Sequence, residues 1–205
     1  MASKVYIDVY YYIDPKTNKE YARTVAGLFK SYQDPKFEKI VITRTDDIAE
    51  YEPGNFYKRE LPPILDVLKE IKRLGYNLKT IIVDGFVHMA ENDGTSYHAG
   101  LGKRLEYALQ GTELEDVEII GVAKHPYSYM FEDTIVEYED KAMYVNEIPK
   151  GVKYPKKGMY ITSNTDHTMQ IAKEIFAMPK LQKGCKFSAL FTLIDHETKK
   201  FKHDN

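Results

Sequence analysis

The sequence from residue 5 to residue 13 is VYIDVYYYI, a run of β-branched and aromatic residues interrupted by one acid, Asp8. Such a run is typical of a strand that is buried on both faces of a sheet. The turn-forming segment DPKTNK follows at residues 14–19, and two further strand-like runs occupy residues 20–29 and 38–44. These segments predict an antiparallel three-strand meander at the start of the chain.

The middle of the chain alternates helices and strands. Residues 45–59 predict a loop, and the apolar residues of 61–74 recur at helical spacing, with Pro62 and Pro63 tolerated only in a first turn. Gly75 is expected to end that helix. The elements predicted next are a strand at 79–84, a loop to about residue 96, a helix at 97–110 and a strand at 117–123. Because crossovers between parallel strands are right-handed, both later strands should lie parallel to the first.

The last third of the chain predicts smaller elements. A peripheral hairpin is expected at 134–148, a short strand at 159–163 and a last helix bearing Met169, Ala172, Ile175 and Phe176 on one face. The end, 179–205, contains a strand-like run, FSALFTLI, and a charged tail that is expected to fray. The prediction is therefore an α/β fold, a mixed sheet flanked by helices, in a single domain spanning 1–205.

Composition limits the class of protein. A formal net charge of −2, from 29 basic and 31 acidic residues, disfavours a chain that coats nucleic acid non-specifically, so any such partner must meet a local patch. Cys185 is the single cysteine, which excludes an intrachain disulfide and favours a reducing compartment. The first strand follows Met1 to Lys4 directly, and no apolar run approaches the length of a membrane span. We expect a soluble cytoplasmic protein, whose oligomeric state has no signature in the sequence.

Two aspartates, Asp8 and Asp84, occupy positions in predicted buried strands, where a carboxylate does not contribute to apolar packing. Asp8 lies in an apolar run, where an unpaired carboxylate is costly unless it lies on a strand face at the sheet edge. Asp84 ends the run 79–84, where open α/β sheets place ligand groups, although a turn-capping or helix-capping role is the alternative. If the two strands are parallel neighbours, both acids share one rim and can bind Mg²⁺ or Mn²⁺.

A third acid and a lysine lie at neighbouring element ends. Glu60 precedes the helix 61–74, where stabilising the helix dipole is a sufficient structural role. Lys124 follows the strand 117–123, and a solvated lysine is the structural alternative. Beside a metal-bound phosphate, a fixed ammonium would neutralise charge that develops in the transition state. Three acids and a lysine together indicate metal-assisted chemistry on a phosphate.

Four motifs, taken in this order, resemble the endonuclease V family. They are Ile7-Asp8-Val9, Tyr51-Glu52-Pro53-Gly54 running into Arg59-Glu60, Val83-Asp84-Gly85, and Ile120-Gly121-Val122-Ala123-Lys124. The resemblance covers residues 4–176 and leaves 179–205 as a divergent C-terminal segment. It implies a ribonuclease-H-like fold and a Mg²⁺-dependent endonuclease, with Mn²⁺ able to substitute. Such an enzyme cleaves a phosphodiester on the 3′ side of a deaminated base, above all hypoxanthine, in DNA or RNA.

The resemblance also implies catalytic roles. It implies that Asp8 and Asp84 bind the metal and that Glu60 holds the metal or its water. Lys124 would lie near the scissile phosphate.

Residues that contact the lesion follow from the same resemblance. Tyr51, Pro53 and Gly54 correspond to a wedge that enters the duplex and takes the place of an extruded base, a role that suits an aromatic or apolar tip. An ordinary surface turn is the alternative for this segment. Gly85 would let the backbone approach the flipped nucleotide, and His88 is the histidine nearest to the lesion-binding position of the family.

The chain departs from the family at two places. Where the family has Gly-His before the last helix, this chain has SNTDH at 163–167, and Thr165 is the strict counterpart of the histidine. Asp166, as a fourth carboxylate, or His167 could serve instead; alternatively, Asp166 caps the helix and His167 points to solvent. After Gly85 the family commonly has histidine and then His-Pro-Arg, whereas this chain is acidic at 91–93.

These departures leave two other functions open. One is a relative that binds nucleic acid on the same fold without efficient cleavage. The other is a metal phosphohydrolase that acts on small nucleotides. The choice between DNA and RNA leaves no motif, because contacts to the 2′-hydroxyl have no sequence signature.

Overall fold

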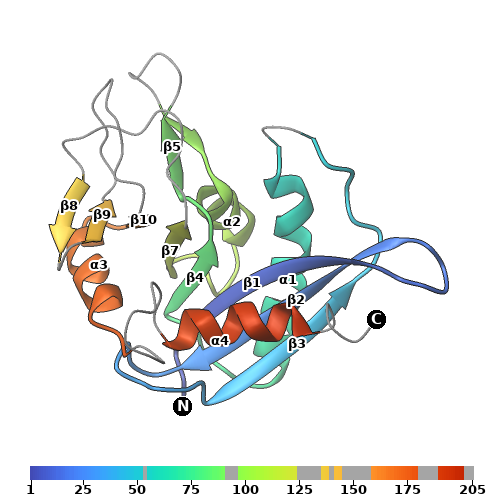
Figure 1. The fold of residues 1–205 in the computed structure, drawn as a ribbon, viewed down its shortest axis with the longest axis horizontal. Helices are drawn as coiled ribbons and strands as arrows, with labels where there is room; N and C mark the ends of the chain where they lie inside the picture. Colours follow the sequence, from blue (N-terminus) through green and yellow to red (C-terminus); the bar gives the residue numbers. More distant parts are fainter. Residues whose placement is uncertain are drawn as a thin grey trace.

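The computed structural model describes residues 1–52, 55–90, 97–123, 135–138, 141–144, 158–179 and 189–200 (Figure 1). Its elements are β1 (Lys4–Ile13), β2 (Glu20–Phe29), β3 (Lys39–Thr45), α1 (Tyr57–Arg73), β4 (Thr80–Asp84), β5 (His88–Ala90), β6 (Tyr97–Ala99), α2 (Leu101–Leu109), β7 (Glu118–Ala123), β8 (Ile135–Tyr138), β9 (Lys141–Tyr144), β10 (Gly158–Ser163), α3 (Thr168–Phe176) and α4 (Ala189–Thr198). Over these residues, none of the helices combines the length and apolar character that a membrane crossing requires.

The described strands, apart from β5 and β6, form one mixed sheet in the order β3-β2-β1-β4-β7-β10-β9-β8. The meander β1-β2-β3 is antiparallel, and β4 and β7 are added parallel to β1, as predicted. The hairpin expected at 134–148 is formed by β8 and β9, at the edge of the sheet beyond β10. The predicted fold class is therefore confirmed.

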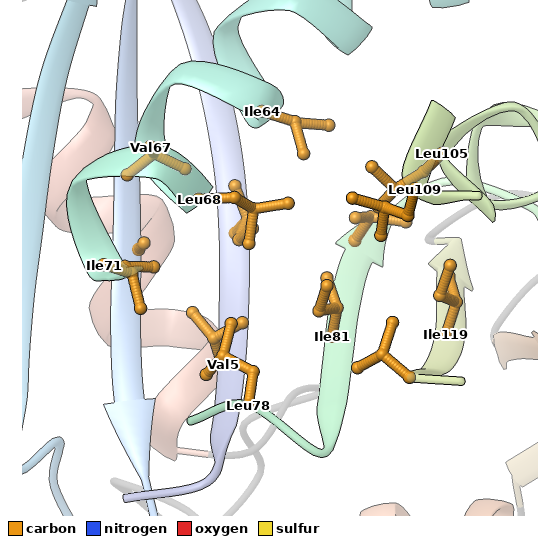
Figure 2. Close-up of a cluster of buried hydrophobic side chains, with 14 of the residues drawn as sticks. Val5, Ile64, Val67, Leu68, Ile71, Leu78, Ile81, Leu105, Leu109 and Ile119 are labelled. Carbon is orange, nitrogen blue, oxygen red and sulfur yellow. The ribbon is translucent and has the colours of Figure 1, made fainter. Parts of the chain in front are cut away.

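One core lies between the sheet and the helices α1 and α2. Figure 2 shows part of this core and labels side chains from α1, α2, β1, β4 and β7 together with Leu78. On β1 and β4 the contributing residues are Val5, Ile7, Ile81 and Val83, every second residue of each strand. The intervening residues of both strands therefore face the opposite side of the sheet.

The second core lies on that opposite side, under α3 and α4. There the run 187–194 was predicted as a strand, but its described part, 189–194, lies in the helix α4, so the prediction was wrong. Leu190, Phe191 and Ile194 are buried together and follow a helical spacing. In so short an apolar run, the sequence pattern fits a strand as well as a helix. Figure 1 shows α4 (red) crossing the sheet over β1 and β2, with which it is in contact.

The helix α1 begins four residues earlier than predicted. Pro62 and Pro63 consequently lie in its second turn. The helix opens with two hydrogen bonds of the i→i−3 type: Lys58 N–H donates to the Asn55 carbonyl at 2.9 Å and Arg59 N–H to the Phe56 carbonyl at 3.0 Å. This extension places Glu60 inside the helix, in its first turn.

The segment after β4 is more ordered than predicted. In place of a loop, β5 and β6 form an antiparallel hairpin, and α2 starts at Leu101 where the predicted helix began at residue 97. The Asp93-Gly94 pair between the two strands was a hairpin signal that the sequence contained. The hairpin matters because it forms one side of a pocket described below.

Gly121 of β7 lies directly under the segment that follows β4. A Cβ added at Gly121 would come within 2.5 Å of the Gly85 carbonyl oxygen and 2.9 Å of the Val87 nitrogen. The same segment is held by Thr162 of β10, whose Oγ1 accepts a hydrogen bond from Val87 N–H at 2.8 Å. The glycine of the 120–124 motif thus has a packing role.

We expect Gly121→Ala to destabilise the protein by about 2–3 kcal/mol, because the added methyl group meets backbone atoms that cannot move aside. Thermal unfolding followed by circular dichroism should show a fall in Tm of about 5–10 °C. Gly111→Ala is the control, since a Cβ there meets nothing within 4 Å and only the positive φ of 72° is strained. A Tm for Gly121→Ala within a degree of wild type would contradict this account.

Candidate active site

Asp8 and Asp84 lie side by side at one end of the sheet. Parallel pairing of β1 and β4 places Ile7 opposite Val83, so the next residues of the two strands, the aspartates, are neighbours. Both belong to the face opposite α1, because Tyr6 and Ile82, two residues earlier, pack in the second core. The condition for sharing a cation, that both point to one side of the sheet, is therefore met.

Glu60 approaches the same rim from α1. The first turn of that helix lies at the end of the sheet where β1 and β4 terminate, because α1 runs back antiparallel to them before β4 begins (Figure 1). Only 9% of Glu60 is exposed. Burial raises its pKa well above the usual range, and the negative charges of Asp84 and Asp8 raise it further.

The donor chemistry of this trio suits a divalent cation. Three carboxylates supply hard oxygen ligands, and the charges of Asp84 and Asp8 raise the cost of ionising Glu60 while no cation lies among them. In the described part of the chain, no group of three or more His, Cys, Asp or Glu side chains is already arranged to hold a metal ion. The trio therefore fits a cation by charge and placement, and its side chains would have to draw together around it.

A pocket of about 310 Å³ opens beside two of the acids. Its walls are Glu60 and Asp84 together with Phe56, Tyr57, Gly85, Phe86, Met89, Ala99, Gly100 and Leu101. The volume is at the lower end of the range for small-ligand sites, about 300–1,000 Å³. A pocket that is largely apolar and aromatic, with carboxylates at one side, suits a flat heterocycle whose attached phosphate lies near the acids.

The predicted wedge residue Tyr51 is in contact with Phe56, one of the residues that line this pocket. Tyr51 is 64% exposed and its ring meets that of Phe56 edge-on, with centroids 6.2 Å apart. The neighbouring Glu52 forms an ion pair with Lys58 at 2.7 Å, so its negative charge is compensated. Pro53 and Gly54 lie outside the described residues, and their wedge role stays a prediction.

Gly85 and His88 were predicted to contact the lesion. Gly85 has φ of +149°, a conformation that side-chain-bearing residues rarely adopt, and it lines the pocket. His88 is half-buried on β5, where the pocket is lined by the adjacent Met89. Burial, with a smaller effect of Lys103, lowers the pKa of His88, so its imidazole is neutral at pH 7. Both roles stay predictions.

Three predicted groups remain: Lys124, Asp166 and His167. Lys124 follows the last residue of β7 and lies outside the described ranges. Asp166 and His167 are both exposed, and α3 has His167 as its N-cap residue without a side-chain capping bond. Asp166 therefore does not cap the helix, and neither residue is among the charges that act on the Glu60 pKa.

The structure adds two residues of α4 that sequence reasoning missed. Asp195 is one of the charges that, after burial, Asp84 and Asp8, raise the pKa of Tyr6. The hydroxyl of Thr198 donates to the Asp8 carboxylate at 2.9 Å. A helical reading of residues 187–198 would have placed both on the face occupied by Phe191 and Ile194, but it would not have indicated what that face covers.

Comparisons with known proteins give matches in structure and none in sequence. No protein-family model and no curated protein matches the sequence. A crystal structure of endonuclease V from Bacillus subtilis has a TM-score of 0.62 at 14% identity, over 98% of this chain and 81% of that one. A crystal structure of human ENDOV has a TM-score of 0.61 at 13% identity, over 100% of this chain and 85% of that one. The chain has the endonuclease V fold.

A third structure with the endonuclease V fold is that of the Ciona intestinalis protein, in complex with a 24mer DNA containing an inosine followed by a ribo-adenosine. Its TM-score is 0.60 at 12% identity, over 99% of this chain and 86% of that one. At these identities the shared property is the fold. What this chain does must be argued from its own side chains.

Proposed function

We propose that this protein is a metal-dependent endonuclease that hydrolyses a phosphodiester on the 3′ side of a deaminated base, hypoxanthine in the first place, in DNA or RNA. The observation that supports this most directly is the convergence of Asp8, Asp84 and Glu60 at one rim of the sheet, beside a largely apolar pocket. The fold, shared with a protein solved on inosine-containing DNA, supports the same assignment.

The three acids would have two roles: two would bind the cation, and the third would orient a water molecule and accept its proton. Asp8 and Asp84, adjacent in register, would bind Mg²⁺, or Mn²⁺ in its place. The bound ion would polarise the phosphate and lower the pKa of a water. Glu60, whose pKa is raised by burial and by its acidic neighbours, would orient that water and accept its proton. Lys124, from its place after β7, would balance charge on the phosphate.

The pocket would hold the base that has been turned out of the stack. Phe56, Tyr57 and Phe86 offer rings against which a purine can pack, and Tyr51 extends that aromatic surface through its contact with Phe56. Gly85, with its positive φ, leaves the pocket wall without a side chain next to Asp84. A base in the pocket would therefore bring the phosphodiester on its 3′ side toward the acids.

The experiment is a cleavage assay on the purified protein in Mg²⁺ and in Mn²⁺. Labelled single-stranded DNA, duplex DNA and RNA, each with and without one inosine, serve as substrates. We expect a product cut on the 3′ side of inosine and no product without metal. Absence of cleavage on every inosine substrate in both metals would reject the endonuclease. Inosine-dependent binding without cleavage would instead identify a binding protein, and phosphate release from free nucleotides a phosphohydrolase.

A further inference from the structure

A hydrogen bond joins the helix α4 to the strand β1, which contains Asp8. Thr198 Oγ1 lies 2.9 Å from Asp8 Oδ2, in a buried contact between residues 190 positions apart. Thr198 itself is fully buried, and Asp8 is 9% exposed. The other oxygen of the aspartate, Oδ1, accepts a hydrogen bond from Val9 N–H at 3.0 Å. The carboxylate is thus held at both oxygens.

The end of α4 is docked on β1 and β2 by two further bonds. The Tyr12 hydroxyl donates to the Thr198 carbonyl at 2.5 Å, and the Arg23 guanidinium donates to the Glu197 carbonyl at 3.3 Å. Carbonyls of the last helical turn have no partner within the helix, so these donors satisfy groups that would otherwise need water. Thr198 is therefore fixed from its backbone as well as its side chain.

The Thr198 hydroxyl has three acceptors within reach and one hydrogen to give. Besides Asp8, the carbonyls of Ile194 and Asp195 lie 3.0 and 3.1 Å from Oγ1. An ionised carboxylate is a stronger acceptor than a peptide carbonyl, so the hydrogen favours Asp8 while that group is charged. Each carboxylate oxygen that accepts one hydrogen bond keeps a further lone pair for a ligand.

We propose that Thr198 is a positioning residue that holds the Asp8 carboxylate in the orientation needed to bind the metal ion. This inference rests on the proposed function, since it gives Asp8 the role of a metal ligand. It assigns a task to α4, which lies in the segment 179–205 where the motifs that resemble endonuclease V have no counterpart. Partners of this kind, bonded to a ligand and not to the metal, commonly change metal affinity about 10–100-fold.

The test measures Mn²⁺ binding directly, by the electron paramagnetic resonance signal of free Mn²⁺ and without nucleic acid. Thr198→Val removes the hydroxyl at nearly constant volume, and we expect it to raise the half-saturating Mn²⁺ concentration about tenfold or more. Thr198→Ser, which keeps the hydroxyl, should remain within about threefold of wild type. Thr24→Val is the matched control: Thr24 is fully buried on β2, and its hydroxyl has no hydrogen-bond partner among the described residues.

The outcomes separate this inference from the proposed function. Equal Mn²⁺ binding by wild type and Thr198→Val overturns the positioning role alone. Loss of binding in Thr198→Ser as large as in Thr198→Val overturns it too, because the hydroxyl would then be irrelevant. If wild type binds no Mn²⁺, the proposed function falls with it. Should Thr198→Val not fold, Tyr12→Phe decides: weaker Mn²⁺ binding supports the inference and unchanged binding overturns it.

Discussion

Asp84→Asn is expected to lower the rate of cleavage of an inosine-containing oligonucleotide at least about a hundredfold in Mg²⁺. The substitution keeps the size of the side chain and removes the charge that, with Asp8, would attract the cation. Substituting even a residue that only supports a metal ligand costs about 10–100-fold, so loss of a ligand should cost no less. Single-turnover kinetics at saturating metal would measure the effect.

The fold of this variant should survive, and that separates chemistry from stability. Asp84 is one of the two charges that raise the Glu60 pKa, so its removal relieves repulsion in the metal-free protein. We expect the metal-free Tm to stay equal or rise. Asp116→Asn, an exposed carboxylate before β7, is the control for the substitution itself. Cleavage by Asp84→Asn at half the wild-type rate would remove Asp84 from the site.

Glu60→Gln should have opposite effects on activity and stability. Activity should fall at least about tenfold, because the glutamine amide cannot accept a proton from the attacking water. Stability of the metal-free protein should rise. Burial, then Asp84 and Asp8, raise the Glu60 pKa above its ordinary 4.5, so ionising this group costs more in the folded protein than in the unfolded chain.

The sign of the pH dependence follows from that raised pKa. The stability associated with a protonated Glu60 is fully present below pH 4.5 and is lost as the pH rises through the raised value. The Tm of Glu60→Gln minus that of wild type should thus be near zero at pH 4.5 and increase to at least about 2 °C at pH 8.

Thermal unfolding in a chelator across this pH range would measure that difference. Glu50→Gln, at an exposed position, should show no such trend. Added Mn²⁺ should stabilise wild type more than Glu60→Gln. A difference in Tm that shrinks with rising pH would mean that Glu60 is stabilised as a charged group, contrary to its placement.

The sheet was predictable because its strands have strong and unambiguous patterns. The run at β1 is apolar on both faces, and the order of strands and helices after it leaves one right-handed arrangement. The same order brings Asp8 and Asp84 to one rim, so their neighbourhood was predictable from connectivity. Glu60 came within reach for a similar reason, since α1 must start where β1 and β4 end.

The parts that were not predictable depend on long-range packing. The run 187–194 fits a strand or a helix by its letters, and only burial of Phe191 against Tyr6, with ring centroids 4.4 Å apart, shows which face it covers. The pocket could not be predicted without the β5–β6 hairpin, which contributes to its wall. The hairpin itself could have been predicted only from the turn signal at residues 93–94. The sequence suggested Asp166, just before α3, as a fourth carboxylate. In the structure it is Asp195 of α4 that, with Asp84 and Asp8, raises the pKa of the buried Tyr6.

The bond between Thr198 and Asp8 has a consequence for how the protein is made. A ribosome synthesises Asp8 of β1 190 residues before the threonine whose hydroxyl donates to its carboxylate. Until α4 has left the exit tunnel, the nascent chain can pair its strands without having a fully oriented carboxylate. A polypeptide released before residue 198 would contain all three acids and still lack that partner. Translation itself would thus delay the full orientation of the Asp8 carboxylate until residue 198 has been made and α4 can dock on β1.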